Sequence, residues 1–225
     1  MTTSPRQIRL LMELRADGIT DPDVLGAIER VPREKFVPRN FQDRAYENTA
    51  LPIGEGQTIS QPYIVALMTQ SLRLHKRARV LEIGTGCGYQ AAVLSHLCWR
   101  VYTVERHRSL AREAAKRFEE LGYSNITTKV GDGSKGWPEQ APFDRIIATA
   151  AAEGDVPQEL LDQLADGGIL VAPIGTSLFD QWLWRYEKTG ETVEKVRLCA
   201  VRFVPLVRSE SRNDSRRRST DAAQD

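Results

Sequence analysis

The chain has 225 residues, 41% of them hydrophobic, and a formal net charge of +1 at pH 7. This length predicts one domain with an accessory segment or two small domains, and the near-neutral charge gives no overall attraction to nucleic acid or to an acidic membrane. The three cysteines, Cys87, Cys98 and Cys199, lack the spacing of a disulfide framework, and no apolar run reaches the ~20 residues of a membrane span, so we expect a cytoplasmic protein without membrane contact.

The N-terminal 38 residues predict two helices. Ser4-Pro5 and Asp21-Pro22 each place a capping side chain before a first-turn proline, and Asp17-Gly18 ends the first helix. The proline-bounded stretch 31–38 cannot continue as regular helix. We expect residues 1–79 to form a helical and loop segment that covers the active site of a core formed by residues 80–207.

Residues 46–62 predict a long ordered loop, because they contain two glycines and two prolines yet keep Leu51, Ile53 and Ile59. Such loops are more often functional than idle. Ser60 precedes a helix expected from about residue 61 to residue 72, and the simplest interpretation of its hydroxyl is a helix N-cap. A capping hydroxyl is compatible with function, because an anion is favoured at the positive end of a helix.

The stretch V-L-E-I-G-T-G-C-G-Y at 80–89 predicts a strand, a glycine loop and the start of a helix, the arrangement that cradles a nucleotide cofactor. Its glycines, Gly84, Gly86 and Gly88, follow G-x-G-x-G spacing, whereas a dinucleotide fingerprint would need a small residue where Tyr89 stands. With Glu82 before the first glycine, the stretch resembles the first motif of class I S-adenosylmethionine-dependent methyltransferases. That resemblance places Glu82 beside the methionine end of the cofactor; an ordinary strand-to-helix turn is the alternative.

The remainder of the core alternates strands and helices. Strands are expected at 100–105, 125–130, 143–148, 169–173, 181–186 and 193–206, and helices at 109–121 and 157–164. This order predicts an α/β fold with a mostly parallel central sheet and helices on both faces, as in Rossmann-like methyltransferases.

Four polar residues end predicted strands, and ligands bind at that edge of a parallel sheet. They are Glu82, Glu105, Asp132 and Thr149. Glu105 lies 21 residues after Gly84, a distance typical of an acidic residue that binds ribose hydroxyls. Asp132 suits a contact with an adenine amino group, and Gly133 permits close approach. The alternatives are a surface glutamate for Glu105 and an ordinary turn aspartate for Asp132.

Several other chemistries lack their residues. The three histidines have no metal-ligand spacing, so we expect no metal, and Ser60 has no evident histidine partner for hydrolysis. There is no phosphate loop. The segment 148–152 lacks both the Asn/Asp-Pro-Pro-aromatic motif and the Pro-Cys nucleophile of DNA methyltransferases, which disfavours nucleic acid as the methyl acceptor. Residues 208–225 predict a disordered, solvated tail.

Six stretches in order carry a more specific resemblance: A-Y at 45–46, L-P-I-G at 51–54, G-Q-T-I-S-Q-P at 56–62, the glycine motif, V-G-D-G at 130–133 and F-V-P-L at 203–206. Together they resemble the protein-L-isoaspartate (D-aspartate) O-methyltransferase family. This resemblance implies a cytosolic repair enzyme that uses S-adenosylmethionine to methylate the free carboxyl group of isoaspartyl residues in damaged proteins, with D-aspartyl residues as a further candidate substrate. We expect the protein to be a monomer. The ester would then collapse to a succinimide, part of which reopens to aspartate.

The same resemblance implies roles for individual residues. Ser60 would be the active-site residue, and Thr58 and Ile59 would place the substrate carboxylate and line the cofactor pocket. The implied cofactor contacts are Gly84, Gly86, Glu105, Asp132 and Gly133, with Glu82 and Gly88 included from the glycine motif. Val207 stands where some relatives carry a threonine, and the tail is not part of the family pattern.

Two other classes remain open on the residues alone. One is a methyltransferase with a different acceptor, such as a small molecule, and the other is a cofactor-binding protein that has lost turnover. The specific 56–62 stretch disfavours the first, and the intact Ser60 and glycines disfavour the second.

Overall fold

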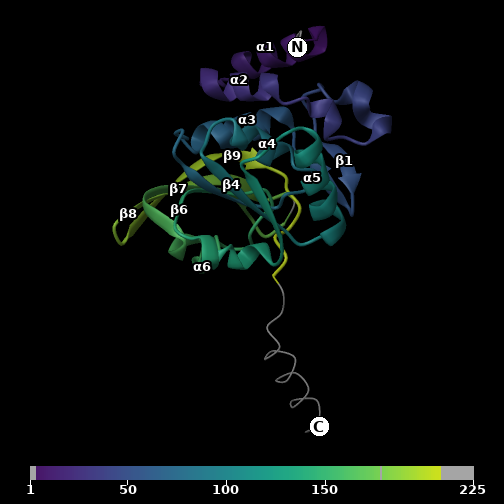
Figure 1. Cartoon of the computed structure of the whole chain (residues 1–225). Helices are drawn as coiled ribbons and strands as arrows, with labels where there is room; N and C mark the ends of the chain where they lie inside the picture. Colours follow the sequence, from purple (N-terminus) through teal and green to yellow (C-terminus); the bar gives the residue numbers. More distant parts are fainter. Residues whose placement is uncertain (1–3, 178, 209–225) are drawn as a thin grey trace, which may run out of the picture.

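In the computed structural model, which describes residues 4–177 and 179–208, a seven-stranded sheet forms the centre of the chain in the order β5-β4-β3-β6-β7-β8-β9 (Figure 1). The first five strands in this order run parallel, while β8 pairs antiparallel with β7 and β9 pairs antiparallel with β8. The mostly parallel α/β sheet is therefore confirmed. Its strands are β3 (Arg79–Ile83), β4 (Arg100–Glu105), β5 (Ile126–Val130), β6 (Phe143–Ala148), β7 (Leu164–Ile174), β8 (Gln181–Thr189) and β9 (Thr192–Val201).

Helices cover both faces of the sheet, as the alternation of elements predicts. One apolar cluster packs the five helices from α1 through α5 against one face of the sheet, and a second cluster packs α6 against the other face (Figure 1). Strand β3 divides its side chains accordingly, with Val80 in the first cluster and Leu81 and Ile83 in the second. The helices of the first face that follow the N-terminal pair are α3 (Pro62–Ser71), α4 (Tyr89–Ser95) and α5 (Arg108–Glu120), and the second face carries α6 (Gln158–Asp162).

The two predicted N-terminal helices are present as α1 (Pro5–Ala16) and α2 (Pro22–Arg30). The Ser4 side chain accepts a hydrogen bond from the Gln7 backbone, and the Asp21 side chain caps α2 in the same way, which confirms both start signals. Within the described ranges, no helix is long and apolar enough to cross a membrane.

The prediction of an irregular loop at 46–62 was wrong for part of this stretch. Residues Leu51–Gly54 (β1) and Gln57–Ile59 (β2) form a small antiparallel hairpin. Leu51 and Ile59 pair across it and are both buried. Glu55, with φ of +51°, lies in the turn between them. Strands of four and three residues are too short for side-chain alternation to stand out in the sequence.

The chain beyond β9 returns to the edge of the sheet that holds the glycine loop. The predicted strand 193–206 ends at Val201, after which Ala151 N donates to Val204 O at 2.8 Å and Leu206 N donates to Ala151 O at 2.7 Å. These bonds place the F-V-P-L segment beside the end of β6. The predicted tail, apart from Arg208, lies outside the described residues.

Candidate active site

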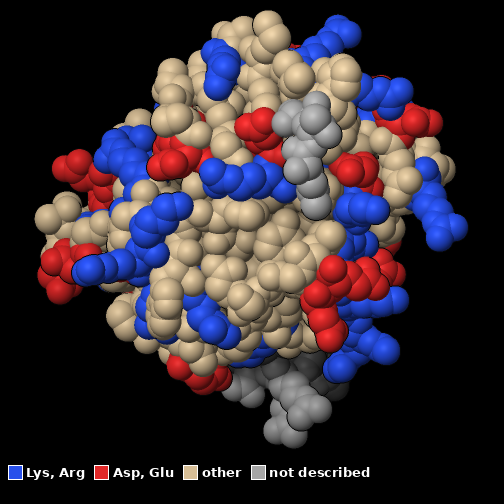
Figure 2. Space-filling view, turned by 45° about the horizontal axis from the view of Figure 1, so that its top comes forward, with Lys and Arg blue, Asp and Glu red and all other residues tan. Residues whose placement is uncertain are grey.

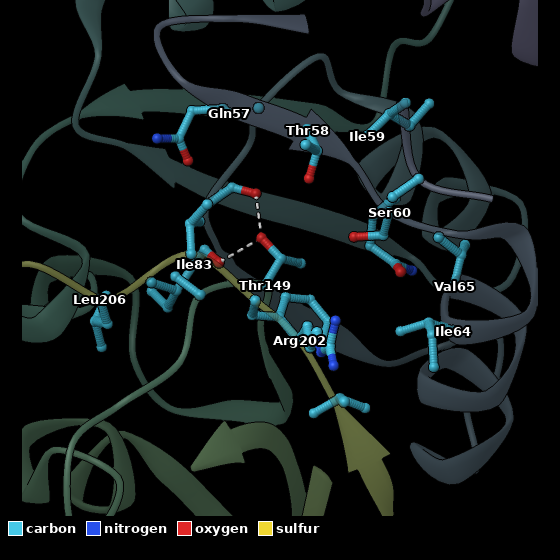
Figure 3. Close-up of a pocket in the computed structure, with 18 of the residues that line it drawn as sticks. Gln57, Thr58, Ile59, Ser60, Ile64, Val65, Ile83, Thr149, Arg202 and Leu206 are labelled. Carbon is cyan, nitrogen blue, oxygen red and sulfur yellow. Dashed lines mark hydrogen bonds between the residues drawn. The ribbon is translucent and has the colours of Figure 1, made fainter. Parts of the chain in front are cut away.

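A pocket of about 850 Å³ lies at the carboxyl ends of β3, β4 and β6 (Figure 3). This volume suits a small-molecule ligand, for which roughly 300–1,000 Å³ is usual. The pocket is lined by seven of the residues predicted from the sequence: Thr58, Ile59, Ser60, Gly84, Gly86, Glu105 and Gly133. The other three predicted residues, Glu82, Gly88 and Asp132, do not line it.

The backbone of the glycine loop forms one wall of the pocket. Gly84 has φ of +94°, and a Cβ added there would lie 2.4 Å from Oγ1 of Thr149. That hydroxyl instead donates to Gly84 O at 2.7 Å, and it also lies 3.1 Å from Ile83 O (Figure 3). Because Gly84 lacks a side chain, Thr149 can tie the end of β6 to the loop and leave bare backbone facing the pocket.

Gly88 has a different role in the same motif. It precedes α4 with φ of +93°, and a Cβ there would lie 2.6 Å from the ring of Phe118 in α5. This glycine therefore permits the close packing of α4 against α5 rather than contact with a ligand.

Glu105 ends β4 at the pocket and is almost fully buried, as the strand-end argument predicts. Its Oε2 accepts a hydrogen bond from Gly86 N and its Oε1 accepts one from His107 N, both at 2.9 Å. A carboxylate offers about four lone-pair sites, so two protein donors leave capacity for two further hydroxyl donors.

Glu82 lies beneath the glycine loop rather than in the pocket, with 0% of its surface exposed. Its Oε2 accepts from Oγ1 of Thr103, which in turn contacts Oγ1 of Thr85 at 2.6 Å. Oε1 has no hydrogen-bond partner within the described part of the chain. The pKa of Glu82 is raised to about 8, mainly by burial and to a smaller extent by the nearby charge of Glu105, with the bond from Thr103 opposing the rise. The side chain is therefore mainly protonated at neutral pH.

Asp132 shapes the turn after β5. Its Oδ1 accepts from Ser134 N at 3.0 Å and from Ser134 Oγ at 2.7 Å, which caps the short 3-10 turn at Gly133–Lys135. Gly133 then faces the pocket, where a Cβ would lie 2.4 Å from Cγ2 of Ile83. The turn interpretation of Asp132 thus describes its observed contacts.

Ser60 and Thr58 point their hydroxyls into the pocket from the strand β2 and the residues after it (Figure 3). The N-cap interpretation of Ser60 was wrong. The N-cap position of α3 is Gln61, and the side chain that accepts from the helix is Oδ1 of Asn48, 3.0 Å from Tyr63 N. Asn48, 15 positions before Tyr63, performs the capping, and the Ser60 hydroxyl makes no hydrogen bond with the described residues.

The pocket also contains residues to which the sequence analysis assigned no role. Asn48, Gln57 and Gln90 contribute amide groups, and Arg106 and Arg202 contribute cations. Arg202 directly precedes the F-V-P-L stretch, which is the only local signal for it. Gln57 lies within the G-Q-T-I-S-Q-P stretch, and chain segments distant in sequence bring Asn48, Gln90 and Arg106 to the same pocket.

Comparison with known proteins gives consistent matches. A model of the family described as protein-L-isoaspartate(D-aspartate) O-methyltransferase (PCMT) matches residues 5–211. A protein-L-isoaspartate O-methyltransferase of Parvibaculum lavamentivorans is 59% identical over 203 residues, which cover 89% of this chain and 91% of the relative. One of Maricaulis maris is 58% identical and covers 92% of this chain and 97% of the relative.

Solved structures agree with these relatives. A protein-L-isoaspartate O-methyltransferase structure superposes with a TM-score of 0.82 at 31% identity, covering 95% of this chain and 69% of the other. A Plasmodium falciparum structure described as a beta-aspartate methyltransferase in complex with S-adenosyl-L-homocysteine has a TM-score of 0.76 at 26% identity, covering 89% and 98%.

Proposed function

The chain belongs to the protein-L-isoaspartate(D-aspartate) O-methyltransferase family, and on that premise we propose how its pocket carries out methyl transfer. The reaction moves a methyl group from S-adenosylmethionine to isoaspartyl residues of damaged proteins. The observation that carries the residue assignment is that one pocket holds the glycine loop, the Glu105 carboxylate and the hydroxyl of Ser60. The resulting ester would collapse to a succinimide and so begin repair.

The residues present fit the cofactor. Gly84 and Gly133 expose backbone where any side chain would collide with Thr149 or Ile83, and Glu105 keeps unused lone pairs at the pocket. When bound, S-adenosylmethionine supplies a methyl group on a sulfonium centre. Glu105 would accept hydrogen bonds from its ribose hydroxyls, and Thr58, Ile59, Gly84, Gly86 and Gly133 would line its site. Glu82, Gly88 and Asp132 contribute by supporting the loops from outside the pocket.

Ser60 positions the substrate carboxylate. A carboxyl group with a pKa near ~4 is already ionised at neutral pH, so the nucleophilic oxygen needs no general base. What remains is alignment, to which well-placed groups contribute several kcal/mol (~7–11 in good intramolecular models). The Ser60 hydroxyl is suited to this task, because it faces the pocket with no hydrogen-bond partner among the described residues.

One assay tests the proposal. Purified protein is incubated with methyl-labelled S-adenosylmethionine and either an isoaspartyl peptide or its normal aspartyl twin. Label transfer to the isoaspartyl peptide alone is the expected result. Transfer to neither peptide despite cofactor binding would favour a protein without turnover, and transfer only to small molecules would favour a different acceptor.

We further propose that the protein works as a cytoplasmic monomer without nucleic-acid or membrane partners. Cys87, Cys98 and Cys199 are free thiols, which suits a reducing compartment. On the face drawn in Figure 2, Lys and Arg side chains are interspersed with Asp and Glu, which does not suit a polyanion. Size-exclusion chromatography with light scattering would test the monomer, and a dimer mass would overturn it.

A further inference from the structure

Arg33 is a buried cation to which the proposed function above assigns no role. It lies in the 3-10 turn Arg33–Lys35, and 0% of its surface is exposed. It forms no ion pair within the described residues. Burial lowers the pKa of its guanidinium, since the charged form is deprived of water. Burying such a charge is unfavourable unless other groups satisfy it.

Backbone carbonyl groups from three places in the chain accept hydrogen bonds from two of the three guanidinium nitrogens. Nε donates to Ala45 O at 2.8 Å, and Nη2 donates to Ser60 O at 2.9 Å and more weakly to Thr49 O at 3.4 Å. Ala45 and Thr49 precede the β1–β2 hairpin, and Ser60 follows it. One planar side chain therefore ties both ends of the hairpin together, which the single ammonium of a lysine could not do with the same geometry.

The same side chain also contacts the helix that follows the glycine loop. Its Cζ lies 4.7 Å from the centroid of the Tyr89 ring. Tyr89 is the first residue of α4, is itself buried and lines the pocket. The Phe36 ring packs against the Tyr89 ring in an edge-to-face arrangement, with the ring centroids 5.5 Å apart. Arg33 therefore lies between Ser60 and the cofactor side of the pocket, held by cation–π attraction on one side and by hydrogen bonds on the other.

From these contacts we propose that Arg33 is a positioning residue for methyl transfer, which sets the place of Ser60 relative to the glycine loop. The inference rests on the proposed role of Ser60 in orienting the carboxylate. It also explains how the hydroxyl stays in place, given that the hydroxyl has no hydrogen bond of its own within the described residues and does not cap α3. On this view the N-terminal segment helps to build the pocket through its buried arginine.

The test compares Arg33→Lys with Arg79→Lys, each made in the wild-type protein and in a Ser60→Ala background. Arg79 is a matched control, because it donates to Pro142 O at 3.1 Å and to Gln140 O at 2.6 Å and lies 5.3 Å from the Tyr102 ring. None of these partners lines the pocket, whereas Thr49, Ser60 and Tyr89 beside Arg33 do. The measurements are kcat with an isoaspartyl peptide, the Kd of S-adenosylhomocysteine, Tm, and hydrogen exchange of residues 57–61.

Arg33→Lys should lower kcat by ~10- to 100-fold, because small misplacements of an aligning group are costly, while the cofactor Kd changes by less than about threefold. In the Ser60→Ala background the same substitution should produce no further loss, since both act on one interaction. Arg79→Lys should lower Tm but leave kcat within about twofold. An equal loss of kcat from Arg33→Lys in both backgrounds, or an unchanged kcat, would overturn the inference.

The readouts separate failure of this inference from failure of the proposed function. If the wild-type protein does not methylate the isoaspartyl peptide, the proposed function is wrong, and hydrogen exchange then tests Arg33. Faster exchange of residues 57–61 in Arg33→Lys but not in Arg79→Lys supports its positioning role, and equal exchange in the two variants overturns it.

A second variant applies if Arg33→Lys does not fold. Tyr89→Leu removes the aromatic contact of Arg33 while keeping the three bonds to backbone carbonyls. Tyr89→Leu should lower kcat by less than Arg33→Lys, and the loss should again disappear in the Ser60→Ala background. A loss that is independent of Ser60 would overturn the inference.

Discussion

The backbone N–H of Gly86 donates a hydrogen bond to Oε2 of Glu105 at 2.9 Å, which ties the glycine loop to the end of β4. The other carboxylate oxygen accepts from His107 N, so both oxygens are oriented before any ligand arrives. This pre-orientation lets one side chain shape the loop and present an acceptor to the pocket at the same time.

Replacing Glu105 by Gln should weaken cofactor binding. The amide has one acceptor oxygen, so its NH2 group must face either the Gly86 or the His107 N–H. Leaving one buried donor unsatisfied costs about 1–3 kcal/mol, and we expect the Kd of S-adenosylhomocysteine to rise about tenfold or more in calorimetric titration. Glu120→Gln, at an exposed helical ion pair, is the control. An unchanged Kd for Glu105→Gln would contradict a ribose contact.

Replacing Ser60 by Ala should lower turnover without a matching loss of cofactor affinity. The Ser60 hydroxyl faces the pocket and does not cap α3, so its removal should leave Tm nearly unchanged. Loss of one aligned donor in an active site typically lowers kcat by ~10²-fold. Steady-state kinetics and cofactor titration measure the two effects separately. Ser95→Ala, which removes a hydroxyl bound to Ala92 O outside the pocket, is the control. Equal losses of kcat and affinity would show that Ser60 acts on the cofactor site as a whole.

Alanine at Gly84 and at Gly88 should have different consequences, although both glycines belong to one motif. Gly84→Ala drives a methyl group into Thr149 at the pocket wall and should abolish measurable cofactor binding. Gly88→Ala drives one into Phe118 and should mainly lower the free energy of unfolding, by roughly 2–4 kcal/mol from strain and overpacking together.

Two further variants separate strain from collision. Gly122→Ala introduces the same left-handed strain, with φ of +76°, where a Cβ meets nothing within 4 Å, and should cost only about 1 kcal/mol in urea unfolding. Phe118→Leu should restore part of the stability lost in Gly88→Ala. Failure of that rescue would mean that the Phe118 collision is not the cause.

The stability of the protein should depend on pH through Glu82. Its pKa is about 8 in the folded protein and 4.5 as the ordinary value. Between these pH values the native state binds a proton that the unfolded chain has released, so this contribution to stability is complete below pH 4.5 and declines as the pH rises toward 8.

The pH dependence of the wild-type protein is compared with that of Glu82→Gln, whose amide side chain does not titrate in this range. Urea unfolding at several pH values from 5 to 8.5 should show the wild-type protein losing at least ~1 kcal/mol relative to Glu82→Gln across this range. Parallel stability curves for the two proteins would show that Glu82 is ionised in the native state.

The sequence by itself determined the elements whose signals are local. The caps Ser4 and Asp21, the strand ending at Glu105 and the turn at the glycine loop each depend on residues within a few positions of one another. Hydrogen bonds of a helix turn and the positive φ that glycine permits act over that same range, so these patterns predict the structure directly.

Only the tertiary structure decided how the pocket is assembled. Asn48 rather than Ser60 caps α3, Glu82 lies under the loop rather than in the pocket, and Arg33 is buried against Ser60 O. These contacts join residues 15 to 27 positions apart or depend on which face of a strand is covered. Their free energy comes from packing between segments, and no local preference of the chain encodes it.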